Sequence, residues 1–132
     1  MPLYFCFTPH GAIPGPVKSG IAKEITRLHI EATGAPAAFI HVVFQDLSVG
    51  SHFLAGKCDH RTSIILANFG GSKAGAVGPK LMKSVSAAWT RLTGQSEEQL
   101  VITLNEAELE ALSEGNHVRH HAEHCVVHVS IA

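Results

Sequence analysis

The sequence lacks an excess of charge of either sign. Its 132 residues include 10 Lys and Arg and 11 Asp and Glu, which leaves a formal net charge of −1 with His neutral. A chain with so little net charge has no long-range field that would attract a nucleic acid backbone or an anionic membrane surface. We therefore expect neither nucleic acid nor membrane as a partner.

Long hydrophobic runs are also missing, although hydrophobic residues make up 45% of the chain. No apolar run reaches the roughly 20 residues that a membrane-spanning helix requires. The same hydrophobic content is too high for an intrinsically disordered chain, and this length corresponds to one domain. We therefore expect a compact, soluble protein with a single domain over residues 1–132.

Cysteine is scarce as well. The three cysteines, Cys6, Cys58 and Cys125, cannot all pair with one another, and the chain does not start with a basic segment followed by a long apolar one. Both observations argue against a secreted, disulfide-rich domain. The simplest interpretation is a cytoplasmic protein with reduced thiols.

What the chain does contain is an internal repeat at an offset of 60 residues, in which Thr33-Gly34 recurs as Thr93-Gly94. Each pair follows apolar residues at steps of three or four, typical of a helix, and precedes alternating apolar residues, typical of a strand. Gly34 and Gly94 are expected to end the two helices in the left-handed conformation. The repeated apolar residues are Val17, Ile21, Ile25, Leu28, Ile40, Val42 and Phe44, then Val77, Leu81, Val85, Ala88, Leu100, Ile102 and Leu104.

A short apolar run before each helix, residues 3–7 and 64–69, predicts a further strand in each copy. Each copy is then a β-α-β unit whose two strands are parallel and joined by a right-handed crossover. The predicted fold class is α/β (α+β), with two tandem β-α-β units that form a four-stranded sheet with two helices on one face. The units span residues 2–46 and 63–106, with a connector at 47–62 and a C-terminal extension at 107–132.

The two remaining segments have patterns of their own. Gly50 and Gly56 in the connector predict a turn or short hairpin. In the extension, Asn105 and Glu108 resemble a capping box that opens a short helix. That helix would run through Leu109 and Leu112, and a terminal strand would contain Val127, Val129 and Ile131.

Both faces of the predicted sheet carry apolar residues, with Tyr4, Cys6, Val43 and Ile65 as examples. Two helices cover only one face, so something else must cover the second apolar face. We expect the chain to form oligomers through this sheet. The alternative is that the C-terminal segment folds over it.

The chain also carries a proline directly after the initiator methionine. Methionine before so small a residue is normally removed, so we expect Pro2 to begin the mature chain, immediately before a strand. An ordinary α-amino group titrates at about 7.7–8.0, and burial among apolar residues lowers the pKa of an amine. Pro2 could then act at neutral pH as a general base, or as a nucleophile toward a carbonyl group.

These features resemble the tautomerase superfamily, which includes 4-oxalocrotonate tautomerase and macrophage migration inhibitory factor. The likeness is closest to the cis-3-chloroacrylic acid dehalogenase group and covers residues 2 to about 114. The matching stretches are Pro2-Leu3-Tyr4, residues 22–29 (AKEITRLH), Thr33-Gly34, Val43-Phe44-Gln45 and Phe53-Leu54.

The resemblance implies a homotrimer with active sites at subunit boundaries and a 2-oxo acid or enol as the small-molecule substrate. It gives Pro2 the role of catalytic base or acid, and His29 the role of binding or orienting the substrate carboxylate. Glu114 stands at the place of a water-activating acid, and Tyr4 matches a tyrosine near the proline. We expect neither a cofactor nor a metal ion in such a site.

The sequence departs from the dehalogenase group at three positions. Gly71 and Ala74 stand in place of two arginines, and Thr103 stands in place of an active-site tyrosine. The only cation near the first two positions is Lys73, and a lysine cannot form the two parallel hydrogen bonds with which an arginine binds a carboxylate. The sequence therefore favours a tautomerase-type isomerase over a dehalogenase or hydratase. The loop with Gly70, Gly71 and Lys73 could bind an anion through its amides and its cation, or be an ordinary turn.

Three alternatives stay open at this point. The missing arginines and tyrosine also fit a catalytically reduced tautomerase-fold protein that binds or serves as a scaffold. His29 could be a packing histidine in the core rather than a ligand. The tail histidines could share a metal ion at helical spacing, and these are His117, His120, His121 and His124.

Overall fold

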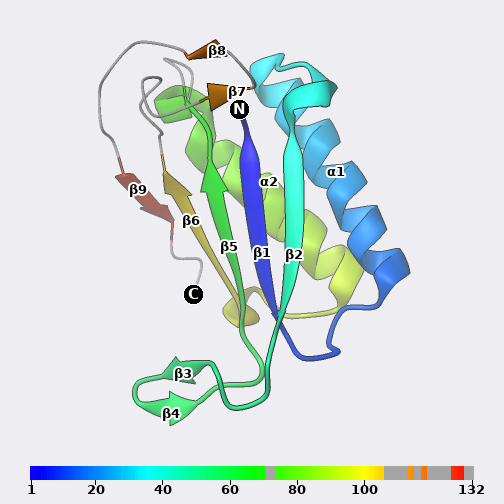
Figure 1. The fold of residues 1–132 in the computed structure, drawn as a ribbon, viewed down its shortest axis with the longest axis vertical. Helices are drawn as coiled ribbons and strands as arrows, with labels where there is room; N and C mark the ends of the chain where they lie inside the picture. Colours follow the sequence, from blue (N-terminus) through cyan, green and yellow to red (C-terminus); the bar gives the residue numbers. More distant parts are fainter. Residues whose placement is uncertain (71–73, 106–112, 115–116, 119–125, 130–132) are drawn as a thin grey trace.

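The computed structural model describes residues 1–70, 74–105, 113–114, 117–118 and 126–129 (Figure 1). Its first β-α-β unit consists of strand β1 (Leu3–Pro9), helix α1 (Gly15–Thr33) and strand β2 (His41–Leu47). A short 3-10 helix, η1 (Ala37–Phe39), precedes β2. Strands β1 and β2 are parallel, as the sequence predicts.

The second unit repeats this order with strand β5 (Ser63–Asn68), helix α2 (Ala74–Thr93) and strand β6 (Leu100–Asn105). Another short 3-10 helix, η2 (Glu97–Gln99), precedes β6, and β5 and β6 are parallel. Gly34 and Gly94 follow the two helices with φ angles of 72° and 77°, which confirms the predicted left-handed ends. At the first of these ends, the Gly34 N–H donates to the Ile30 carbonyl oxygen at 2.8 Å.

The units join through antiparallel pairing of β1 and β5, with Phe5 opposite Leu66 at the centre of the sheet. Strand β9 (Val126–Val129) adds to the outer edge of β6, which confirms the predicted terminal strand. The sheet order is β2-β1-β5-β6-β9, so β9 extends the sheet rather than covering its face. The predicted helix through Leu109 and Leu112 lies outside the described residues.

Two small hairpins complete the described chain. The connector forms the predicted short hairpin from β3 (Phe53–Leu54) and β4 (Lys57–Cys58). A second hairpin, from β7 (Ser113–Glu114) and β8 (His117–Val118), was not predicted. Figure 1 places the first hairpin at one end of the sheet and the second at the other end, where β1 begins.

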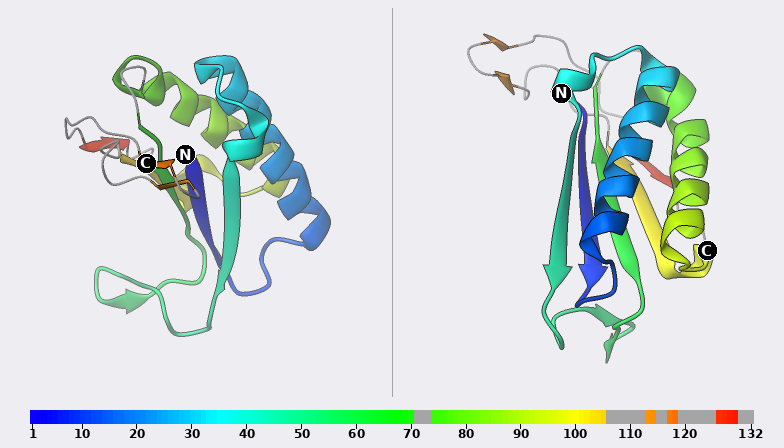
Figure 2. Two further views of the ribbon diagram at one scale, coloured as in Figure 1. Left: turned by 45° about the horizontal axis from the view of Figure 1, so that its top comes forward. Right: turned by 90° about the vertical axis from the view of Figure 1, so that its right-hand side faces the viewer.

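The two helices lie side by side on one face of the sheet (Figure 2). The core between them and the sheet contains Tyr4, Cys6, Ile65 and Trp89, each with at most 1% of its surface exposed. Burying a large apolar side chain contributes about 1.5–3 kcal/mol, so this layer supplies most of the stability of the chain. Among the described residues, no helix has both the length and the apolar character needed to cross a membrane.

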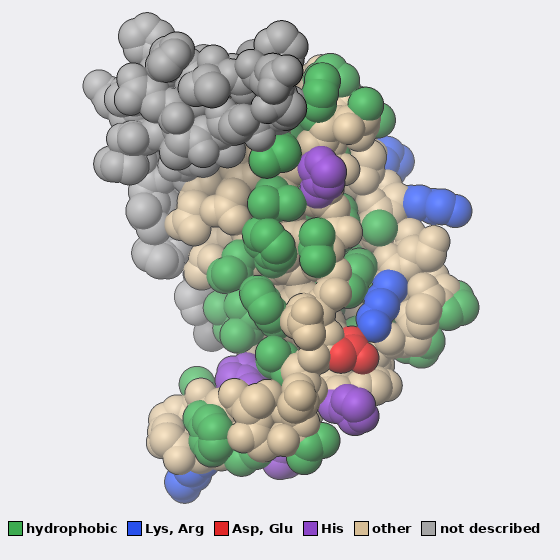
Figure 3. Space-filling model, in the orientation of Figure 1, with side chains coloured by type: hydrophobic (Ala, Val, Ile, Leu, Met, Phe, Trp, Pro, Cys, Tyr) green, Lys and Arg blue, Asp and Glu red, His purple; other side chains and the backbone are tan. Residues whose placement is uncertain are grey.

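On the opposite face of the sheet, no helix of the described residues lies over the strands (Figure 2). Exposure alternates along β1, β5 and β6, and Val43 on β2 is 41% exposed. Hydrophobic side chains gather over the middle of this face (Figure 3), as predicted for a sheet that is apolar on both sides. The apolar members of this open face are Leu3, Phe5, Phe7, Val43, Ile64, Leu66 and Val101.

Candidate active site

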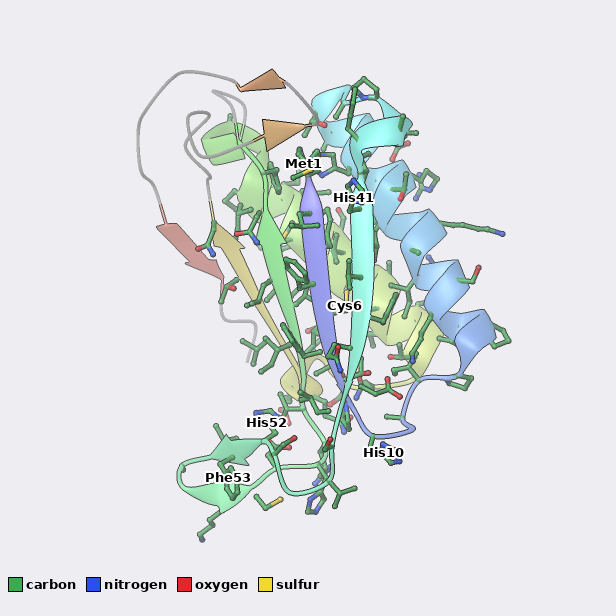
Figure 4. All side chains as sticks on the ribbon, in the orientation of Figure 1. Met1, Cys6, His10, His41, His52 and Phe53 are labelled. Carbon is green, nitrogen blue, oxygen red and sulfur yellow. The ribbon has the colours of Figure 1, made fainter. Side chains whose placement is uncertain are left out.

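One end of the sheet brings together the start of β1 and the predicted site residues around it. Pro2 is buried there, and its carbonyl oxygen accepts a hydrogen bond from the His41 N–H at 2.9 Å. On the other side of β1, β5 ends at the same level, and the Phe69 N–H donates to the Asn105 carbonyl oxygen at 3.2 Å. Pro2 thus lies in the middle of this end of the sheet, between β2 and β5, where backbone hydrogen bonds fix the strands. We call this end of the sheet, around Pro2, the sheet edge or catalytic edge below. Figure 4 shows Met1 and His41 together at this end.

Helix α1 places His29 against this edge from the covered face. His29 is 1% exposed, and a hydrogen bond of 2.7 Å joins its Nδ1 atom to the hydroxyl oxygen of Tyr4. Its ring also packs edge-on against Phe69, with the ring centroids 4.8 Å apart. Because Tyr4 is two residues beyond Pro2 on the same strand, Pro2 and Tyr4 share the face toward His29.

The environment keeps both rings of this pair uncharged at neutral pH. Burial, helped by the positive charge of the chain's amino terminus, lowers the pKa of His29 to about 4. Burial also raises the pKa of Tyr4 far above its ordinary value. His29 can therefore take part in hydrogen bonding near Pro2, but it does not supply a positive charge there.

A row of polar residues crosses the open face at the same edge. Leu3 lies opposite His41 on one side and Asn68 on the other, and Asn68 lies opposite Asn105. His41, Asn68 and Asn105 thus form a polar row around the start of β1, followed by an apolar surface. The sequence did not lead us to predict this row. A signal for His41 was present, because neighbouring strand residues point to opposite faces of a sheet. If Ile40, Val42 and Phe44 face the helices, His41 must lie on the open face.

The other predicted residues lie at several places around this end of the sheet. Gly70 follows β5 and is partly buried, while Gly71 and Lys73 lie outside the described residues. The backbone of Glu114 lies in β7, at the end of the molecule where β1 begins (Figures 1 and 2). Thr103 lies on the open face, on a strand separated from β1 by β5. A single chain therefore does not bring Thr103 to the face on which Tyr4 and His29 meet.

Within the described residues, no group of three or more His, Cys, Asp or Glu side chains is placed to hold a metal ion. Of the four tail histidines, His117 is described in its backbone only, and the other three lie outside the described residues.

The chain is similar in sequence to known proteins. Residues 1–114 match the model of the family Tautomerase_3, described as "Putative oxalocrotonate tautomerase enzyme". A stretch of 40 residues is 38% identical to a protein of Streptococcus pneumoniae serotype 4 (strain ATCC BAA-334 / TIGR4) named "Probable tautomerase". That stretch covers 30% of this chain and 67% of the relative.

Solved structures share the fold over most of the chain. The crystal structure of N1, a member of the cis-3-chloroacrylic acid dehalogenase family, superposes with a TM-score of 0.81 at 22% identity. That match covers 89% of this chain and 82% of N1. The R7 fused 4-OT, a wild-type asymmetric trimer, superposes with a TM-score of 0.78 at 19% identity, covering 88% of this chain and 94% of that one.

Proposed function

The chain belongs to the tautomerase superfamily, and from the geometry of its sheet edge we propose that it is an isomerase of 2-oxo acids and their enols with Pro2 as general acid and base. The observation that carries the proposal is the burial of Pro2 at this edge, on the face where Tyr4 and His29 meet. A secondary amine held there is poorly hydrated as an ammonium ion, so its pKa falls toward neutrality.

The proposal requires that Met1 be removed. While Met1 is attached, the nitrogen of Pro2 belongs to an amide and cannot accept a proton. After removal, the amino-terminal charge lies one residue nearer to Tyr4 and His29. Because His29 is uncharged at neutral pH, burial rather than repulsion by an imidazolium ion lowers the pKa of the Pro2 amine.

In the proposed reaction, the neutral Pro2 nitrogen accepts the enol hydroxyl proton and the same nitrogen then returns a proton to carbon. The enol oxygen becomes the carbonyl oxygen, the carbon gains the hydrogen, and no net charge is left on the protein. A single group that acts first as base and then as acid needs a pKa near the working pH. No cofactor is required for this proton transfer.

Hydrogen-bond donors around the edge would hold the substrate. The polar row of His41, Asn68 and Asn105 presents side chains that can bind carboxylate or enolate oxygens. In the proposal, the sequence Gly70-Gly71-Ser72-Lys73 adds backbone amides and a cation. Donors aimed at the developing oxyanion lower the barrier to proton transfer. Tyr4 and His29 contribute a neutral, hydrogen-bonded wall on the other side.

We infer that the protein is a homotrimer that packs through the open face. This face exposes apolar residues, including Val43, which a soluble monomer would leave in water. The R7 fused 4-OT of the same fold is a trimer. Such packing would bring Thr103 of one chain toward a neighbour, so residues that one chain keeps apart could meet at a subunit boundary.

The isomerase proposal is preferred to dehalogenation or hydration of a chloroacrylic acid. Position 74 opens α2 with an alanine, so the start of this helix offers no guanidinium there. The likeness to N1 lies below 25% identity and carries the fold only. The absence of arginine at positions 71 and 74 also motivates the alternative of a binding or scaffold protein. The experiment below distinguishes that alternative from an enzyme.

The test is the rate of ketonisation of phenylenolpyruvate or 2-hydroxymuconate by protein whose intact mass shows that Met1 is gone. Pro2→Ala is expected to lower kcat/KM by about 10²–10⁴-fold, the usual contribution of a positioned acid or base. A variant that retains Met1 should be equally impaired. Equal rates for wild type and Pro2→Ala would end the isomerase proposal for these substrates and favour the scaffold alternative.

A further inference from the structure

The sheet has an approximate twofold axis that relates the two β-α-β units. Along the central antiparallel pair, Leu3 lies opposite Asn68, Phe5 opposite Leu66, and Phe7 opposite Ile64. A rotation about the Phe5–Leu66 pair therefore exchanges β1 with β5 and places Ser63 where Pro2 lies. The offset between these two strands is 61, one more than the offset of 60 between the helices. The second unit must then have its own sheet edge, at the opposite end of the molecule, equivalent to the edge around Pro2.

The acid and base of the first edge are absent from the second. Ser63 is fully buried in a continuous chain, and its hydroxyl donates to the Gln95 Oε1 atom at 2.9 Å. Trp89 occupies the helix position of His29, at the repeat offset of 60, and its Nε1 atom donates to the same Gln95 oxygen at 2.7 Å. The buried space next to the strand is thus filled by a structural network.

A depression with an accessible volume of about 350 Å³ nevertheless opens at this second edge. It lies between β4 with the residues that follow it and the segment around η2. Its lining includes Lys57, Arg61 and Thr62 on one side and Ser96, Glu98 and Gln99 on the other. Figure 4 shows the hairpin that carries β4 at the end of the sheet opposite to Met1.

Arg61 stands on a backbone that is held from both sides. Its N–H donates to the Asp59 Oδ1 atom at 2.8 Å, and its carbonyl oxygen accepts from the Gln95 Nε2 atom at 3.2 Å. Asp59 also accepts from the N–H and the hydroxyl of Thr62, at 3.0 and 2.7 Å. These hydrogen bonds lower the pKa of Asp59 to about 2, and the bond from the Arg61 N–H has the largest effect. The Asp59 carboxylate is thus bonded within the turn.

The guanidinium group of Arg61, in contrast, forms no ion pair within the described residues. Arg27 and Arg91 both bind Glu24, whereas Arg61 is the one arginine in the described part of the chain without a carboxylate partner. An exposed guanidinium on a fixed backbone, with the Lys57 ammonium lining the same depression, offers the fork and the second cation that a carboxylate requires. Two acids, Asp59 and Glu98, line the same depression, so the formal charges of the lining balance, which disfavours a dianion such as phosphate.

We propose that this depression is a second, non-catalytic site that binds small monocarboxylates through Arg61 and Lys57. It is the counterpart of the catalytic edge without the amino-terminal proline, so a ligand bound there is held and not converted. The site itself follows from the twofold relation and the free cations. The choice of a 2-oxo acid as its ligand rests on the proposed function.

The test is a titration of the ¹⁵N-labelled full chain with pyruvate, followed by NMR at the backbone amides of Arg61, Thr62 and Gln99. Saturable shifts at these amides are expected in wild type and also in Pro2→Ala, which separates this site from the catalytic edge. Arg61→Gln should weaken the binding by about tenfold or more, the cost of losing a charged hydrogen bond. Arg91→Gln, which removes an exposed arginine elsewhere, should leave it unchanged.

Three outcomes would overturn the proposal. Shifts confined to the start of β1 would place the only binding at the catalytic edge. Equal titration of wild type and Arg61→Gln would remove Arg61 from the site. Equal or tighter binding of inorganic phosphate at the same amides would contradict the preference for a monocarboxylate. If Pro2→Ala loses no activity but the Arg61 amides still titrate with pyruvate, the proposed function fails while this site stands.

Discussion

At the scale of single residues, the account depends on a histidine that is kept neutral inside the protein. Burial against Tyr4 and Phe69 lowers the pKa of His29 to about 4, from an ordinary value of 6.5. Between these values an unfolded chain binds a proton at His29 and the folded chain does not, so acidification favours unfolding across this window. Above pH 6.5 the residue is neutral in both states and has no effect on the pH dependence.

We predict that the free energy of unfolding decreases as the pH falls from 6.5 to 4, and that His29→Gln removes much of this decrease. His10→Gln, at an exposed position near the other end of the sheet, is the control and should keep the wild-type dependence. Urea unfolding at fixed protein concentration measures the effect. An unchanged pH dependence in His29→Gln, or an NMR titration of the His29 ring near pH 6.5, would contradict the buried neutral state.

The sequence allowed Pro2, Tyr4 and His29 to be chosen as candidates, but not the bond between them. The strand pattern predicts that Pro2 and Tyr4 share a face, whereas the contact of Tyr4 with His29 depends on how α1 crosses the sheet. The polar row of His41, Asn68 and Asn105 depends on pairing between strands that are far apart in the sequence. The roles of Lys73 and Glu114 stay predictions.

At the scale of the elements, the second unit is closed by a tight contact between α2 and β6. Gly78 is buried on α2, and a Cβ atom at this position would overlap the side chain of Leu104, itself fully buried. Gly20, in the interior of α1, has no atom within 4 Å of such a Cβ. The two helices thus offer a matched pair of glycines in opposite environments.

We predict that Gly78→Ala destabilises the fold by about 0.5–2 kcal/mol, because displacing a core side chain costs about 1–3 kcal/mol and the higher helix propensity of alanine offsets only about 0.5–1 kcal/mol of it. Gly20→Ala should instead stabilise it by about 0.5–1 kcal/mol, because alanine has the higher helix propensity. Denaturant unfolding of the two variants beside wild type gives both numbers. A stabilised Gly78→Ala would show that α2 lies farther from β6 than described here.

Most helices and strands could be predicted because the same pattern of apolar residues occurs twice in the sequence. The repeat offset of 60 located both helices, their glycine ends and the second strand of each unit, and short apolar runs located the first strand of each. The face of each strand could not be assigned from the pattern, because both sets of alternating residues are apolar. In the structure Tyr4, Cys6 and Ile65 face the helices, while Val43 lies on the open face.

At the scale of the whole molecule, the proposed homotrimer depends on the open face. We predict that Val43→Glu, which places a charge on the β2 side of this apolar surface, dissociates the proposed trimer and lowers activity at low protein concentration. Ala87→Glu, at an exposed position on α2, adds the same charge on the helix side and should leave the trimer intact. Sedimentation velocity distinguishes them, and a monomeric wild type or a trimeric Val43→Glu would contradict packing through the sheet.

The proton-transfer role of Pro2 can be tested most directly by comparing two titrations of the same protein. In Met1-free protein labelled with ¹⁵N-proline, the pH titration of the Pro2 nitrogen should give a pKa below the about 7.7–8.0 of an ordinary α-amino group. The pH profile of kcat/KM for phenylenolpyruvate should give the same value. A Pro2 nitrogen that does not titrate, or that titrates at a pH where the rate does not change, would contradict the proposed mechanism.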